Sequence, residues 1–178
     1  MLDSTNTMKA IETRYKGYRF RSRLEARWAV FFDELRVPYS YETEGWQLSS
    51  GYYLPDFYLK DANLWVEIKP GKLTAEDIEK CRQLAESKSV LLVSGDPWPN
   101  EFSITYFYPP DERITGEDRG TCFVFAMSRR CNSLAVVNPD GAAHIFCSDA
   151  KCTCGVRYPV EDDTRLKKAF EKARGARF

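Results

Sequence analysis

The apolar residues of the first hundred positions recur with two periods, one helical and one extended. Residues 22–36 carry apolar side chains at helical spacing, and Ser22 stands where an N-cap is expected. A second helix is predicted from Thr74, because Asp77 follows three residues later as in a capping box. The other apolar segments alternate with polar residues or form short continuous runs, which is typical of strands.

Strands and helices alternate in an order that predicts an α/β protein with a mixed β-sheet flanked by helices. The predicted strands cover residues 39–48, 52–59, 64–69, 89–94, 102–108 and 122–127. The second of these should return on the first as a hairpin, and the turn Lys60–Asn63 should lead into the third. A β-ribbon over 131–159 and a terminal helix over 162–173 complete the prediction.

Composition is that of a folded protein rather than a disordered chain. Of the 178 residues 43% are hydrophobic and 14% aromatic, and no apolar run is long enough to span a bilayer. The N-terminus has no basic start followed by an apolar stretch, so we expect a bacterial cytoplasmic protein whose six cysteines stay reduced. The formal net charge is zero, which argues against coating nucleic acid by bulk attraction but leaves local basic patches open.

Three charged residues lie inside the β-prone segments and carry the chemical signal. Asp56 lies in Leu-Pro-Asp-Phe-Tyr-Leu, and Glu67 and Lys69 lie in Val-Glu-Ile-Lys. Residues two apart in a strand share a face, and a neighbouring antiparallel strand would place Asp56 beside them. Two carboxylates and an ammonium in one cluster suit a hard cation such as Mg²⁺ or Mn²⁺. The plainer alternatives are a turn role for Asp56 and a surface salt bridge between Glu67 and Lys69.

The order of these motifs resembles the PD-(D/E)XK nuclease superfamily, over roughly residues 12–98. The resemblance implies a restriction-endonuclease-like core over residues 12–108, with residues 121–178 as a small C-terminal appendage of β-ribbon and helix that could pack on the core. It also implies an acidic residue on the first helix, here Glu25. The metal ligands would then be Asp56, Glu67, the backbone carbonyl of Ile68, and Glu25. Glu25 has an alternative role, because Ser-x-x-Glu is also a capping box.

The function implied is metal-dependent hydrolysis of DNA phosphodiester bonds by an endonuclease of phage or mobile-element type. In that reading Glu25, Asp56, Glu67 and Lys69 are catalytic, and Lys69 orients the attacking water and offsets charge on the phosphorane. The partners would be DNA and either a second copy of the chain or a targeting protein, with no membrane. The alternative is a catalytically silent nucleic-acid- or protein-binding module on the same fold.

Two further groups of residues have a candidate role and a plainer one. A basic segment could contact phosphates or be a solvated face; its arginines are Arg19, Arg21, Arg23 and Arg27. Four cysteines near His144 could hold a structural Zn²⁺ or be ordinary reduced thiols; they are Cys131, Cys147, Cys152 and Cys154.

Overall fold

The computed structural model describes residues 10–110, 122–127, 133–137, 144–147 and 163–178. The helices are α1 (Arg23–Glu34), α2 (Ala75–Leu84) and α3 (Thr164–Gly175), with a 3₁₀ turn η1 (Lys60–Ala62). The strands are β1 (Thr13–Tyr15), β2 (Tyr18–Phe20), β3 (Tyr39–Tyr41), β4 (Trp46–Leu48), β5 (Gly51–Tyr53), β6 (Phe57–Leu59), β7 (Leu64–Lys69), β8 (Ser89–Gly95), β9 (Phe102–Phe107), β10 (Cys122–Met127), β11 (Leu134–Val137) and β12 (His144–Cys147). Within the described part of the chain, no helix has the length and apolar character to cross a membrane.

Eight of the described strands form one mixed sheet in the order β12-β11-β10-β9-β8-β7-β6-β3. The pair β7 and β8 is parallel and is joined through α2, whereas the other neighbours are antiparallel. β7 and β8 are buried on both faces over most of their length, as expected for strands covered by helices on each side. The predicted mixed sheet flanked by helices is therefore confirmed.

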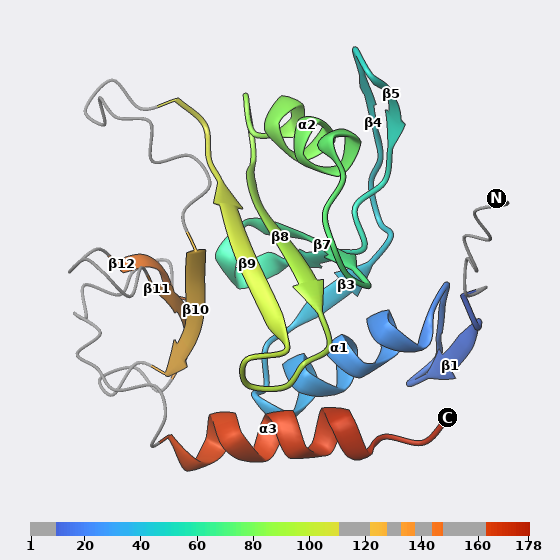
Figure 1. The fold of residues 1–178 in the computed structure, drawn as a ribbon, viewed down its shortest axis with the longest axis vertical. Helices are drawn as coiled ribbons and strands as arrows, with labels where there is room; N and C mark the ends of the chain where they lie inside the picture. The colour runs from blue at the N-terminus through green and yellow to red at the C-terminus, as the bar shows by residue number, and fades with distance from the viewer. Residues whose placement is uncertain (1–9, 111–121, 128–132, 138–143, 148–162) are drawn as a thin grey trace, which may run out of the picture.

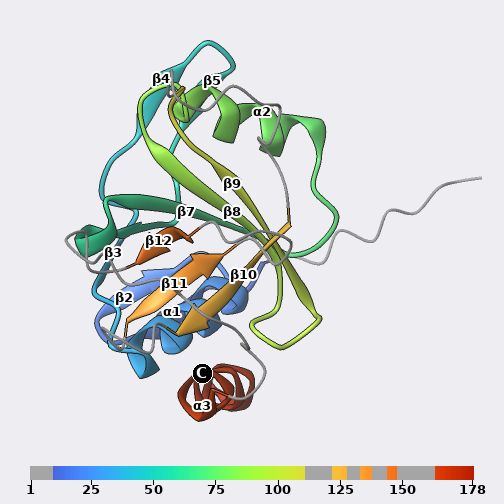
Figure 2. The same ribbon diagram turned by 90° about the vertical axis from the view of Figure 1, so that its left-hand side faces the viewer.

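Helices cover the two faces of the sheet unequally (Figures 1 and 2). α1 and α3 lie against one face, where Trp28, Phe31 and Phe32 pack with Val66, Leu91 and other strand residues. The ring of Phe170 on α3 stacks on that of Phe31, with centroids 4.8 Å apart. α2 covers the other face with a smaller cluster that includes Cys81 and Leu84. The segments predicted as core and appendage share this sheet, because β10 pairs with β9.

The helix starts follow the sequence closely. Ser22 caps α1 by accepting a hydrogen bond from the backbone N–H of Glu25, and Thr74 and Asp77 form the predicted capping box of α2. The terminal helix begins after Asp163, whose side chain accepts from the backbone N–H groups of Arg165 and Leu166. These predictions are confirmed, with shifts of one or two residues at the ends.

The predicted hairpin over residues 39–59 is correct in its pairing but wrong in its continuity. β3 pairs with β6 and β4 pairs with β5, but four residues, 42–45, lie opposite only three, 54–56. Pro55 has no N–H to donate to a ladder, and Glu42 adopts a left-handed φ of 47°. The interruption puts Asp56 immediately before β6 rather than in the middle of a long strand.

Candidate functional site

Asp56 and Glu67 lie side by side because of the register between β6 and β7. Phe57 pairs with Val66, so the next positions outward along the antiparallel ladder are Asp56 and Glu67. Positions opposite one another in such a ladder project to the same face. Both side chains are buried, Asp56 at 3% and Glu67 at 5% exposure. A solvated turn role for Asp56 does not agree with this burial.

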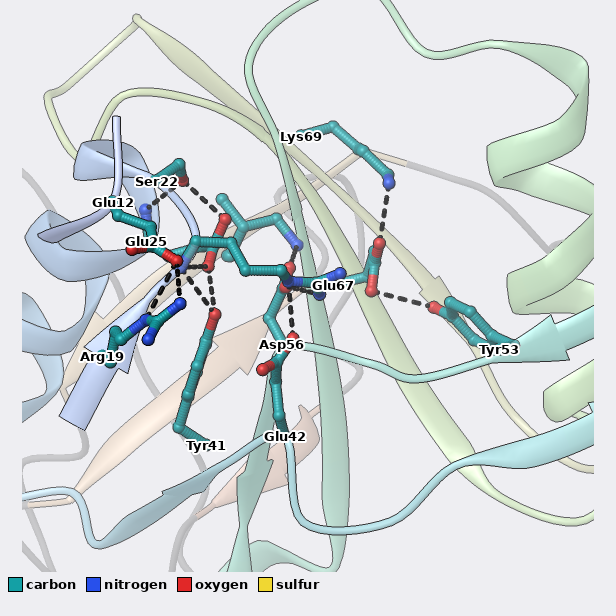
Figure 3. Close-up of polar contacts among 12 residues, drawn as sticks. Glu12, Arg19, Ser22, Glu25, Tyr41, Glu42, Tyr53, Asp56, Glu67 and Lys69 are labelled. Carbon is teal, nitrogen blue, oxygen red and sulfur yellow. Dashed lines mark hydrogen bonds and ion pairs between the residues drawn. The ribbon is translucent and has the colours of Figure 1, made fainter. Parts of the chain in front are cut away.

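Each of the two carboxylates has one oxygen fixed by a neutral donor and the other facing a cation (Figure 3). For Asp56, the backbone N–H of Ile68 donates to Oδ2 at 2.7 Å, and the guanidinium of Arg21 lies 3.0 Å from Oδ1. For Glu67, the hydroxyl of Tyr53 donates to Oε2 at 3.3 Å, and Lys69 Nζ lies 2.8 Å from Oε1. The orientation and the charge balance of each acid therefore depend on different neighbours.

Lys69 is held between two acids. Its ammonium lies 2.8 Å from Glu67 Oε1 and 3.3 Å from Asp77 Oδ1. The other oxygen of Asp77 accepts hydrogen bonds from the backbone and hydroxyl of Thr74, so the cap of α2 also anchors the lysine. Burial alone would lower the pKa of Lys69, but Glu67 and Asp77 raise it above its ordinary value. Lys69 is therefore a stable cation and hydrogen-bond donor at neutral pH, not a proton acceptor.

Glu25 contacts the N-cap residue of α1 but does not complete the capping box, because its carboxylate accepts from the Ser22 hydroxyl and not from the Ser22 backbone N–H. Its Oε1 accepts from the Ser22 hydroxyl at 2.6 Å, and its Oε2 accepts from the Arg21 backbone N–H at 3.1 Å and from the Tyr41 hydroxyl. These three donors occupy both oxygens. The charge of Glu25 nevertheless reaches the site, because it contributes to the raised pKa of Asp56. The predicted role of Glu25 as a metal or water ligand is not reflected in its present contacts.

The carboxylates of Asp56 and Glu67 are costly to keep charged. Burial raises the pKa of Asp56 well above its ordinary value, and the nearby charges of Glu67 and Glu25 raise it further, against the opposing effects of Ile68 N–H and Arg21. Burial also raises the pKa of Glu67, although Lys69 partly offsets this. Additional positive charge at Asp56 and Glu67 would relieve both effects.

The donor set of these two acids fits a hard divalent cation. Asp56 Oδ1 and Glu67 Oε1 are the oxygens that already face cationic groups, and carboxylate oxygens are ligands that Mg²⁺ accepts. Within residues that the structure describes, no three acidic, histidine or cysteine side chains are close enough to hold a metal together. Asp56 and Glu67 are thus a two-carboxylate site, to which Glu25 is adjacent rather than joined.

The four candidate DNA-binding arginines have different surroundings. Arg19 pairs with Glu12 at 2.6 Å, and Arg27 pairs with Asp96 at 2.7 Å. Arg21 joins the acidic site, and Arg23 is exposed without an ion pair in the described part of the chain. Of the four arginines, Arg21 alone therefore contacts Asp56 or Glu67; two of the others form ion pairs elsewhere and one is exposed.

The candidate zinc site lies almost wholly outside the described residues. Cys131, Cys152 and Cys154 fall in segments that are not described, and Cys147 is described only as a backbone position in β12. Cys81, in contrast, is a buried free thiol on α2, and burial raises its pKa to about 12. Its thiol is therefore unreactive at neutral pH.

Several polar contacts of the site have no signal in the sequence spacing. Tyr41, Tyr53 and Arg21 reach the acids from 14 to 35 residues away. Tyr41 and Tyr53 occupy β-prone positions where aromatic side chains are expected for packing alone.

Comparisons with known proteins give no match to a family model, to a curated protein or to a solved structure.

Proposed function

We propose that the protein is a metal-dependent nuclease with a restriction-endonuclease-like core that hydrolyses DNA phosphodiester bonds. The observation that carries the proposal is the buried pair Asp56 and Glu67 with the cation Lys69 at the end of β7. A protein that only binds DNA has no physical need for two mutually repelling buried carboxylates, because burial of charge is costly.

In this proposal Asp56 and Glu67 hold Mg²⁺ or Mn²⁺, with the Ile68 carbonyl as a further ligand. The cation supplies neutralisation of phosphate charge and a lowered pKa for a bound water. Glu25 adds negative charge close to Asp56 and fixes the start of α1 through Ser22.

The chain's own groups position the reacting atoms. Lys69 donates hydrogen bonds toward the attacking water and the phosphate oxygens, where negative charge develops. Asp77 and Glu67 hold the lysine in place, so its ammonium is preorganised rather than recruited. Tyr53 orients Glu67 from the side opposite Lys69.

The test is cleavage of supercoiled, linear, branched and single-stranded DNA in Mg²⁺, Mn²⁺ or EDTA. Wild-type protein is compared with Asp56→Ala and Lys69→Ala, and with Asp61→Asn as a control at an exposed position. We expect metal-dependent cutting that both site variants lose and the control retains. Equal background cutting by all four proteins would refute the nuclease and favour the binding module.

A further inference from the structure

Arg21 lies where the proposed cation would bind. Its guanidinium is 3.0 Å from Asp56 Oδ1, and its Nε is 2.5 Å from Glu42 Oε1. The second oxygen of Asp56 is already taken by the Ile68 N–H at 2.7 Å. Oδ1 is thus the oxygen of Asp56 that both a metal ion and the arginine would use.

The two partners of this ion pair differ greatly in their access to solvent. The Arg21 side chain is 55% exposed, whereas that of Asp56 is 4% exposed. A half-exposed guanidinium can move out into water, where it becomes more fully hydrated, but the buried carboxylate cannot move away. The backbone of Arg21 stays fixed, because its N–H donates to Glu25 Oε2 and to the Tyr41 hydroxyl.

We infer that Arg21 is a displaceable internal counter-ion: it neutralises Asp56 when no cation is bound, yields Oδ1 to a divalent cation, and then turns to a DNA phosphate. This inference rests on the proposed function and adds a regulatory step to it. The guanidinium suits the second task, because its planar donors match phosphate oxygens in a bidentate arrangement. Binding of metal and of DNA would then be coupled through one side chain.

The direct test measures Mn²⁺ affinity without turnover, from the electron paramagnetic resonance signal of free Mn²⁺. Wild type is compared with Arg21→Gln, Asp56→Asn and Arg23→Gln, the last removing an exposed positive charge two residues away. We expect Arg21→Gln to bind Mn²⁺ about two- to fivefold more tightly, because loss of a competing, partly exposed ion pair removes at most about 1 kcal/mol of opposition to the metal. Arg23→Gln should change the affinity less than about twofold, because exposed charges are screened.

The outcomes separate this inference from the proposed function. If wild type binds Mn²⁺ and Asp56→Asn does not, the metal site stands. The counter-ion role alone is then overturned if Arg21→Gln shows no gain in Mn²⁺ affinity, or if Arg23→Gln shows an equal gain. Absence of Mn²⁺ binding by wild type overturns the metal site and the inference with it.

Two further measurements report on the Arg21 side chain. In wild-type protein, the Arg21 Nε–H resonance should shift on addition of Mg²⁺, whereas that of Arg27, paired with Asp96, should not. In Ca²⁺, fluorescence anisotropy should show that Arg21→Gln binds a DNA duplex several-fold more weakly than wild type, the opposite sign to its metal affinity. An Arg21 resonance unmoved at saturating Mg²⁺, or unchanged DNA affinity, contradicts the displacement.

Discussion

Replacing Asp56 by asparagine is expected to stabilise the metal-free protein at pH 8. The pKa of Asp56 is raised by burial and by the charges of Glu67 and Glu25, so the folded state binds a proton more tightly than the unfolded state does. The stability of such a group is fully present below its ordinary pKa of about 3.9 and is lost as the pH rises through its folded pKa. At pH 8 the folded wild-type protein therefore carries a cost that a neutral amide avoids.

The gain in unfolding free energy depends on which contacts of Asp56 the asparagine keeps and which it loses. Asparagine retains an acceptor oxygen for the Ile68 N–H but loses the ion pair with Arg21, whose side chain is 55% exposed. Partly exposed pairs contribute only about 0–1 kcal/mol. Relief of an unfavourable site residue typically stabilises by about 0.5–2 kcal/mol, so we expect roughly 1 kcal/mol at pH 8 and near zero at about pH 4.

Urea unfolding in EDTA at several pH values measures this directly, with a similar m value required of both proteins. Asp61→Asn, at an exposed position, is the matched acid-to-amide control. Adding Mg²⁺ at pH 8 should stabilise the wild type, by ~1.4 kcal/mol at ten times its Kd, but not Asp56→Asn. An Asp56→Asn protein less stable than wild type at pH 8, by an amount independent of pH, would show that the carboxylate is favourably solvated and that our account of the site is wrong.

Three other substitutions test the support of the site and of the sheet. Asp77→Asn should lower the single-turnover cleavage rate about tenfold, because Lys69 loses one of its two acidic anchors; an unchanged rate would mean that Glu67 alone suffices. Ser22→Ala should cost about 0.5–2 kcal/mol in urea unfolding through loss of the α1 cap, and no change would argue against the cap. Trp28→Ala, at a fully buried side chain, should cost about 3–5 kcal/mol by the same measurement, and a smaller loss would indicate that the core closes over the cavity.

The pairing of the two acids could be predicted from sequence because it depends on local connections. The turn at residues 60–63 joins β6 to β7 directly, so strand periodicity alone sets Asp56 opposite Glu67 and sends Glu67 and Lys69 to one face. The helix caps were equally accessible, since Ser22 and Thr74 lie three residues from their partners. Contacts within a few residues leave a pattern in the sequence.

The supporting partners could not be predicted, because they depend on how distant elements pack. Arg21 meets Asp56 from 35 residues away and Tyr53 meets Glu67 from 14. The small β1–β2 hairpin is not predicted from the sequence. Lys16 and Gly17 form its turn with positive φ values of 46° and 85°. A lysine-glycine turn between short strands gives a weaker signal than the asparagine-glycine turns that favour this conformation.

The two cationic side chains of the site, Lys69 and Arg21, differ in how easily a bound metal ion would displace them. Lys69 is 32% exposed and is held by two carboxylates, one of them fixed by the α2 cap, so moving it would leave buried charge unpaired. Arg21 is 55% exposed, and of its two acidic partners only Asp56 would share an oxygen with a bound metal. An arriving divalent cation therefore displaces Arg21 at lower cost than Lys69. On this argument the site keeps its lysine in place through the proposed reaction and exchanges its arginine.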